Sequence, residues 1–204
     1  MLDKSPELIS DNNLTHIQNE FEQNVPSIIL CSEPFYKMEF LNKLINSIEN
    51  PIIFVDMDLL YTGYFKSGMI QKKENVMVFH PDKTSWKQKI SEIISKVSEE
   101  KFLVVIDSFN GVYNMYDDLE SAIFLNSCIM LLASLGCKTN SSIIVTAMAK
   151  KKENDTWVLS PGGKQIIRSE KTGVYFLKKV ENNLIISTVD DGKTNSKTFK
   201  ISQM

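Results

Sequence analysis

The strongest constraint on the fold is the segment FLVVIDSF, which occupies residues 102–109. It opens with five consecutive apolar residues, three of them β-branched, and such a run predicts a strand covered on both faces, as in the middle of a parallel sheet. The run ends in Asp107, and ligands of parallel sheets lie at the carboxyl ends of the strands. A carboxylate at this position either holds a metal ion or polarises a water molecule, or it only caps the following loop. The segment alone leaves both interpretations open.

Length and composition predict one soluble α/β domain. The chain has 204 residues, of which 43% are hydrophobic and 24% are charged, and this is the balance of a globular protein with a sizeable core. No apolar run approaches the ~20 residues that span a bilayer. The N-terminus lacks the basic and apolar regions of a signal peptide. We therefore expect a cytoplasmic protein without a membrane partner.

The positions of cysteine and histidine predict no metal site. The three cysteines, Cys31, Cys128 and Cys137, are an odd number, and each is flanked by apolar sequence. We expect reduced core thiols rather than disulfides or metal ligands. The two histidines, His16 and His80, are far apart and show no metal-ligand spacing, so we assign them no chemistry.

Charge is divided unevenly along the chain. Residues 150–200 carry eleven Lys or Arg against six Asp or Glu, a net charge of +5. The first 149 residues carry twelve against nineteen, a net charge of −7. Such a division either steers an anionic partner towards the basic part or reflects only a solvated face.

Strands and helices alternate through the first 149 residues. We expect strands at 25–31, 51–56, 76–80, 102–107 and 142–146, and helices at 8–21, 36–49, 86–99 and 117–135. Gly136 is expected to end the last helix. Residues 59–75 are expected to be irregular, because Gly63 and Gly68 would break a helix. The alternation predicts a parallel sheet with right-handed crossovers.

The pattern changes after this point. Segments 174–179 and 184–188 flank Glu181-Asn182-Asn183, a turn signal that predicts a β-hairpin, and a further strand is expected at 198–202. We expect a single domain in three parts. These are a lead-in segment (about 1–24), a parallel αβ core (25–149), and a basic loop followed by the C-terminal hairpin strands (150–204).

Several segments resemble the core of the RecA-type ATPases, and most closely that of the archaeal RadA and RadB recombinase group. Residues 104–108 (VVIDS) resemble the Walker B strand, which ends in Asp-Ser. Residues 54–58 (FVDMD) resemble the strand whose Asp-x-Glu end carries the catalytic Glu, here Asp58. Residues 144–148 (IVTAM) stand where the family has Val-Thr-Asn-Gln. The tail segments PGGKQII, VYFLKK and FKI follow the closing Pro-x-Gly-Gly, hairpin and Phe-x-Ile segments.

The resemblance implies a RecA-like fold. Such a fold is a mostly parallel, twisted α/β sheet with helices on both faces and a C-terminal antiparallel hairpin. It also implies a strand order in which the strand ending at Asp107 lies between the second and the fifth predicted strands.

The phosphate-binding loop departs from the family pattern. Gly-x-x-x-x-Gly-Lys-Ser/Thr is required because backbone N–H groups crowd around phosphate oxygens, where a Cβ would intrude. This chain reads CSEPFYKM at that position. Cys31 and Tyr36 replace both glycines, Pro34 removes one N–H, and Met38 cannot ligate Mg²⁺. Lys37 alone matches the pattern.

Two further departures affect catalysis. Met148 stands where a sensing Gln would be, and Asp58 is one methylene shorter than the catalytic Glu. Because phosphoryl transfer depends on positioning and electrostatics, we expect no physiological ATP hydrolysis and no ATP–Mg²⁺ cofactor.

The resemblance still identifies remnant site positions. The catalytic remnants are Asp58 and Asp107, and the nucleotide-binding remnants are Lys37, Asp107 and Ser108. In an inactive site we expect Lys37 and Asp107 to pair with each other.

Residues 149–157 (AKKKENDTW) stand where RadA-like proteins carry a mobile DNA-binding loop. Three consecutive lysines beside an aromatic residue can pair with phosphates and stack a base. The candidate nucleic-acid residues are Lys150, Lys151, Lys152, Trp157, Lys164 and Arg168. The alternative is a solvated hairpin in which Trp157 packs onto its own domain.

Three functions follow from these observations. The leading interpretation is a catalytically inactive RecA-fold paralogue that serves as an accessory protein in DNA recombination and repair. It would bind single-stranded DNA, a RadA-type recombinase or another RecA-fold subunit, in a homo- or hetero-oligomer. The second is a scaffold subunit similar to the RecA-fold subunits of the Elongator tRNA-modification complex. The third is a weakly active KaiC-like ATPase with an unorthodox loop. The sequence does not distinguish DNA from RNA as the ligand.

Overall fold

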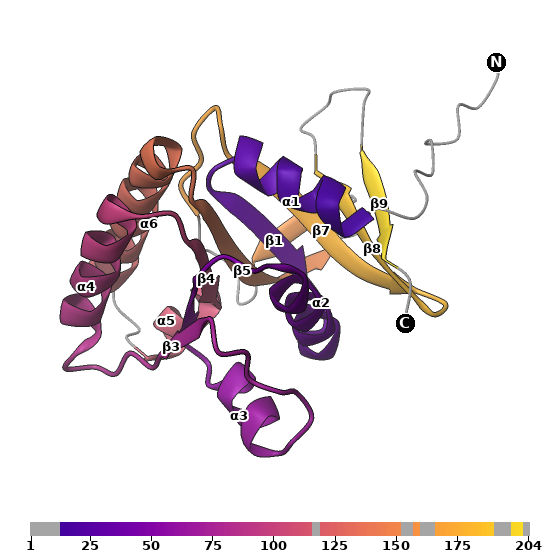
Figure 1. Ribbon diagram of the computed structural model, residues 1–204, viewed down its shortest axis with the longest axis horizontal. Helices are drawn as coiled ribbons and strands as arrows, with labels where there is room; N and C mark the ends of the chain where they lie inside the picture. Colours follow the sequence, from indigo (N-terminus) through magenta and orange to yellow (C-terminus); the bar gives the residue numbers. More distant parts are fainter. Residues whose placement is uncertain (1–12, 116–118, 152–156, 160–165, 190–196, 202–204) are drawn as a thin grey trace.

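Parallel strands joined by helices make up most of the molecule (Figure 1). The computed structural model describes residues 13–115, 119–151, 157–159, 166–189 and 197–201. The helices are α1 (Asn13–Gln23), α2 (Pro34–Ser47), α3 (Leu60–Lys66), α4 (Trp86–Glu99), α5 (Phe109–Met115) and α6 (Leu119–Thr139). The strands are β1 (Ser27–Cys31), β2 (Ile52–Asp56), β3 (Val76–Phe79), β4 (Leu103–Asp107), β5 (Ser142–Lys151), β6 (Trp157–Leu159), β7 (Gly173–Val180), β8 (Asn183–Thr188) and β9 (Thr198–Ile201).

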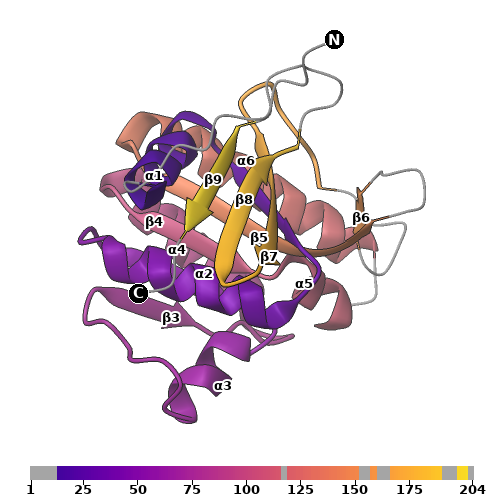
Figure 2. The same cartoon turned by 90° about the vertical axis from the view of Figure 1, so that its right-hand side faces the viewer.

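The described strands form one nine-stranded sheet in the order β3-β2-β4-β5-β1-β7-β8-β9, with β6 beside β5. Strands β1 to β5 and β7 pair in parallel, whereas β8 and β9 run antiparallel to their neighbours (Figure 2). The predicted mostly parallel α/β sheet with a C-terminal antiparallel hairpin is therefore confirmed. The predicted position of β4, between β2 and β5, is confirmed as well.

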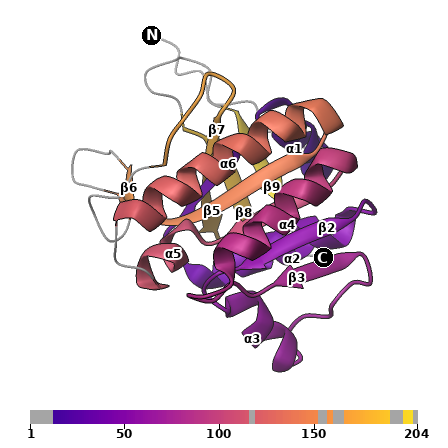
Figure 3. The ribbon, with the colours of Figure 1, turned by 90° about the vertical axis from the view of Figure 1, so that its left-hand side faces the viewer.

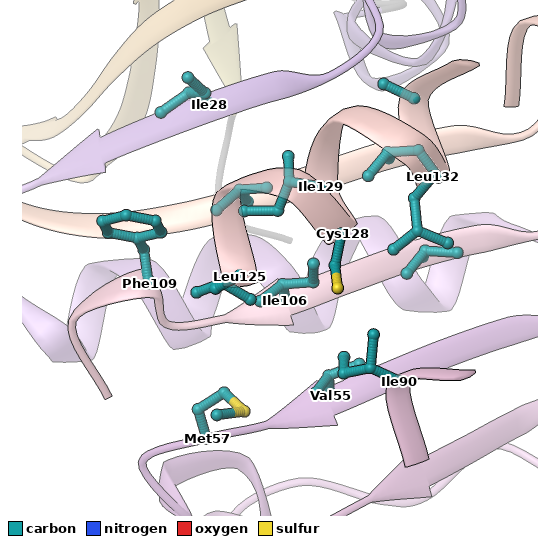
Figure 4. Close-up of a cluster of buried hydrophobic side chains, with 14 of the residues drawn as sticks. Ile28, Val55, Met57, Ile90, Ile106, Phe109, Leu125, Cys128, Ile129 and Leu132 are labelled. Carbon is teal, nitrogen blue, oxygen red and sulfur yellow. The ribbon is translucent and has the colours of Figure 1, made fainter. Parts of the chain in front are cut away.

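Helices cover both faces of the sheet, and the alternation of side chains along each strand divides the core in two. On one face, Val104 and Ile106 of β4 belong to a cluster that α4, α5 and α6 complete. On the other face, Leu103 and Val105 belong to a cluster with α1, α2 and strands β8 and β9. Figure 3 shows α4 and α6 side by side over the sheet, and Figure 4 shows Ile106 beside Leu125 of α6. Every residue of β4 is buried, as its sequence predicts.

Helix α6 is long and apolar. Its segment Glu120–Thr139 is 20 residues long with a mean hydropathy of 1.5, so by length and composition it passes the test for a membrane span among the described residues. Half of this segment is buried inside the fold. Leu125, Ile129 and Leu132 are at most 1% exposed and pack in the cluster under α4. This packing identifies α6 as a helix of the protein core, which explains its apolar composition.

The prediction that Gly136 ends this helix is wrong. The helix continues to Thr139, and Asn140 with a φ of 57° follows it. A Cβ at position 136 would lie 2.8 Å from the carbonyl oxygen of Ser141, whose N–H donates to the Gly136 carbonyl at 3.0 Å. The glycine is therefore explained by the close return of the chain rather than by a helix end.

Three further expectations differ from the structure. Residues 59–75 contain α3, which runs through Gly63, where a Cβ would meet no neighbouring atom. Helix α5 begins directly after Ser108 and was not predicted. Cys31 and Cys128 are buried as expected, but Cys137 is exposed on α6.

The two glycines make a matched test of these assignments. Gly136→Ala should lower the free energy of unfolding by about 1–3 kcal/mol, because the added methyl group overlaps a backbone oxygen. Gly63→Ala should raise it by about 0.5–1 kcal/mol, because the methyl group meets no neighbour and the helical backbone becomes stiffer. Urea unfolding of both variants measures the difference. Equal midpoints would contradict the close approach at position 136.

Candidate functional site

Polar residues gather where the parallel strands end. Asp56 closes β2 and lies opposite Asp107, which closes β4, and Thr146 lies on the adjacent β5. Phe54 and Val105 face the α2 side of the sheet, so Asp56 and Asp107, two residues further along their strands, face the same side. All three polar residues are fully buried. The edge of the sheet thus holds two buried carboxylates beneath α2.

The side chain of Lys37 reaches this edge from the first turn of α2. It is only 1% exposed, and its Nζ lies 2.6 Å from Asp107 Oδ1 and 3.1 Å from Asp58 Oδ2. Thr146 Oγ1 donates to the same Asp107 oxygen at 2.5 Å. The expected pairing of Lys37 with Asp107 is present, and Asp58 joins it as a second partner.

The charges of this pair support each other. Burial alone would lower the pKa of Lys37, but attraction to Asp107 and Asp58 and hydrogen bonds to both raise that pKa above its ordinary value. Burial raises the pKa of Asp107 to about 6, although the charge of Lys37 acts in the opposite direction. The 2.6 Å contact between Lys37 Nζ and Asp107 Oδ1 is an ion pair inside the protein.

The connection between β1 and α2 is short. Only Ser32 and Glu33 separate Cys31 from Pro34, the first residue of α2. The N–H of Lys37 donates to the Glu33 carbonyl at 3.2 Å, so it is already engaged within the helix. Burial raises the pKa of the Cys31 thiol to about 12, and this neutral thiol stands where the first loop glycine would be.

Lys37 also determines what the carboxylates can hold. Oxygens of Asp56, Asp58 and Asp107 lie within 4.8 Å of one another, a spacing at which they could hold a metal ion. The Lys37 ammonium binds two of the three. Asp58 additionally accepts a hydrogen bond from the Leu60 N–H at 3.2 Å, so it is engaged at the start of α3.

The remaining nucleotide-binding remnant, Ser108, is buried directly after β4. Its carbonyl accepts a hydrogen bond from the N–H of Gly111 at 2.9 Å within the first turn of α5.

The candidate nucleic-acid residues are only partly described. Strand β5 extends to Lys151, and β6 pairs Trp157 opposite it, so the expectation of a loop throughout 149–157 is wrong at both ends. Lys150 is exposed on β5, and Arg168 is exposed beyond β6. Lys152 and Lys164 lie outside the described residues, as do the side chains of Lys151 and Trp157.

Two positions near the site were overlooked in the sequence. Thr146 belongs to the segment that resembles the family's fifth strand. A polar residue between two buried residues of a strand is the sequence feature that could have identified it as part of the site. His80 directly follows β3, but its neighbours come from β2 and α3, and no local spacing reveals them.

Comparisons with known proteins identify the class of fold. No family model and no curated protein matches the chain. Among solved structures, 132 chains match. A DnaB-like replicative helicase superposes with a TM-score of 0.58 at 9% identity over 97% of this chain and 63% of the helicase chain. A RadB recombinase superposes with a TM-score of 0.54 at 15% identity over 88% of this chain and 89% of its own. This chain therefore has a RecA-like fold, built on a RecA-type core.

The ion pair gives a test by mutation. Lys37→Met should lower the free energy of unfolding by about 3–5 kcal/mol, because Asp107 is left as an unpaired buried carboxylate. The double variant Lys37→Met/Asp107→Asn removes both charges and should recover most of this loss. Urea unfolding of the two single variants and the double variant forms a double-mutant cycle. Additive losses would show that the two groups do not stabilise each other.

Proposed function

We propose that this chain is a catalytically inactive RecA-fold paralogue that acts in the cytoplasm as an accessory protein in DNA recombination and repair. It binds single-stranded DNA, a RadA-type recombinase, or both. The proposed loss of catalysis rests on the contacts of the Lys37 ammonium. Its Nζ lies 2.6 Å from an Asp107 oxygen and 3.1 Å from an Asp58 oxygen.

The ion pair opposes nucleotide binding energetically. To reach a phosphate, Lys37 would leave both carboxylates, and Asp107 would remain buried and unpaired. Breaking such a pair costs about 3–5 kcal/mol, which nucleotide contacts would first have to offset. Pro34 and the engaged N–H of Lys37 leave few donors for those contacts.

The nucleic-acid part of the proposal has separate support. The structural neighbours include a recombinase and a replicative helicase. The segment 150–200 carries a net charge of +5, and Lys150 exposes its side chain on β5. Lysines pair with phosphates without sequence preference, which suits an accessory role on single-stranded DNA.

Nucleotide binding is tested by thermal stability. A ligand that binds only the folded state stabilises it by about 2.7 kcal/mol at a hundredfold excess over its Kd. Millimolar ATP–Mg²⁺ should produce a negligible shift relative to Mg²⁺ alone, because Lys37 is occupied by its carboxylate partners. A shift of several degrees that Lys37→Ala abolishes would contradict the proposal.

DNA binding is tested by its salt dependence. We expect micromolar affinity for single-stranded DNA and a slope of log K against log[salt] of roughly −2 to −3, corresponding to three or four neutralised phosphates. Replacing Lys150, Lys151 and Lys152 with Ala should flatten this slope. Trp157→Ala should leave the slope unchanged and weaken binding by about 1–3 kcal/mol through lost stacking. Fluorescence anisotropy at several salt concentrations provides the measurement.

A matched control replaces three exposed lysines elsewhere, Lys66, Lys72 and Lys83, and changes the net charge equally. Its slope should equal that of the unaltered protein. An equal loss in both triple variants would indicate binding through net charge alone. Absence of binding at low salt would favour a protein-docking role for the basic segment, as in a scaffold subunit.

A further inference from the structure

The outer face of α6 differs from that of α4, although the two helices lie side by side over the same face of the sheet (Figure 3). The exposed side chains of α4 include Lys87, Glu92 and Lys96, as is usual for a helix that faces water. On α6, by contrast, no charged residue occurs between Glu120 and Lys138. At a rise of about 1.5 Å per residue, α6 is uncharged over about 27 Å of its length.

Large apolar side chains are exposed along this face. Ile123 is 57% exposed and Leu131 is 47% exposed. Ile167 is 52% exposed, and it lies beside α6 because its N–H donates to Asn126 Oδ1 at 2.9 Å. Single exposed apolar residues are common on protein surfaces, but a group of them on one face marks an interaction site.

The outermost residues of α6 follow a regular spacing of four and three. They are Glu120, Phe124, Ser127, Leu131, Ser134 and Lys138, which we call the α6 seam. All of them are exposed except Phe124, which is partly buried against Trp86. An average spacing of 3.5 residues keeps one line of side chains facing a second helix along its whole length. The seam therefore has the geometry of a helix-pairing surface.

We propose that the α6 seam binds the α6 seam of a second copy of this chain, with the two helices antiparallel. In this arrangement Leu131 of one copy faces Ser127 of the other copy. Phe124 faces Ser134 in the same way. Each large side chain thus fills the space above a small one, as close packing between helices requires. Because the pair is two-fold symmetric, every such contact occurs twice.

The charges at the ends of the seam favour the antiparallel orientation. Lys138 of each copy faces Glu120 of the other, so both ends carry opposite charges. A parallel pair would instead place like charges together at both ends and leave Ser127 facing Ser127. Glu120 is available for this contact, because its side chain is 88% exposed and lies 3.8 Å from Lys87. A surface pair of this kind contributes little to stability.

The size of the seam predicts a weak dimer. Contact along a single helix pair falls below the total buried area of about 1,200 Å² that separates weak complexes from stable ones. We expect a dissociation constant of about 10–100 micromolar. The dimer is independent of the proposed accessory function, because it uses neither the Lys37 pair nor the lysines at 150–152. Its test contains neither nucleotide nor DNA, so a failure of one proposal leaves the other unaffected.

Dimerisation is tested by sedimentation velocity between about 5 and 500 micromolar protein, in a Cys137→Ser background that removes the exposed thiol. The unaltered seam should show a monomer–dimer equilibrium. Leu131→Lys should weaken association by about tenfold or more, because each dimer would bury two unpaired lysines. Met69→Lys is the matched control. It changes the charge equally at an apolar residue that is 71% exposed beyond α3, and it should dimerise as the background protein does.

The orientation is tested by disulfide cross-linking in the same background, in which the two remaining cysteines are buried. An equal mixture of the Ser127→Cys and Leu131→Cys variants, oxidised with copper phenanthroline, should form mixed dimers that mass spectrometry identifies. Either variant alone should cross-link several-fold less, because an antiparallel pair places position 127 opposite position 131.

Three results would overturn the proposal. The first is a protein that stays monomeric at the highest concentration, which would leave the α6 seam to a different partner. The second is a dimer that Leu131→Lys and Met69→Lys weaken equally. The third is stronger cross-linking of the Ser127→Cys variant with itself than in the mixture, which indicates parallel helices.

Discussion

The ion pair between the Lys37 ammonium and Asp107 is the interaction on which the carboxyl edge of the sheet depends. It joins α2 to the central strand β4, while Asp58 ties the same ammonium to the start of α3 and Thr146 ties the same carboxylate to β5. Burying two charges is unfavourable unless each is paired and hydrogen-bonded. Here the two charges are paired and Asp107 Oδ1 is hydrogen-bonded, whereas the buried Asp107 Oδ2 has no hydrogen-bond partner among the described residues. Four elements meet at this one electrostatic centre. The same contacts occupy the lysine that a phosphate would otherwise attract.

The geometry of the sheet makes this pair possible. Strict alternation along β2 and β4 sends Val55 and Ile106 towards α4 and α6, and it turns Asp56 and Asp107 towards α2. Helix α2 starts almost directly after β1, so the first turn of the helix lies over the ends of the neighbouring strands. This placement brings the Lys37 side chain to the two carboxylates at the strand ends.

Sequence reasoning predicted most of the fold, because the strands and helices carry clear apolar periodicity. Helix α4 begins and ends at its predicted residues, and the resemblance to the RecA-type core supplied the position of β4 in the sheet. The errors arose where tertiary contacts override local signals, as at Gly136, which serves a close chain approach instead of a helix end. The pair of Lys37 and Asp107 was predictable from the altered loop. The contacts of His80 with Thr62 and Asp56 were not, because these residues meet only after the strands have assembled.

The central claim is that the Lys37 ammonium is permanently engaged by carboxylates, and NMR observation of that group tests it most directly. A proton–nitrogen correlation spectrum that selects lysine ammonium groups should contain one slowly exchanging signal that Lys37→Met removes, because the group is buried and hydrogen-bonded. The account predicts that millimolar ATP–Mg²⁺ leaves this signal unchanged. A signal that shifts or broadens on adding ATP–Mg²⁺ would show that Lys37 leaves its carboxylates for a phosphate, and it would contradict the account.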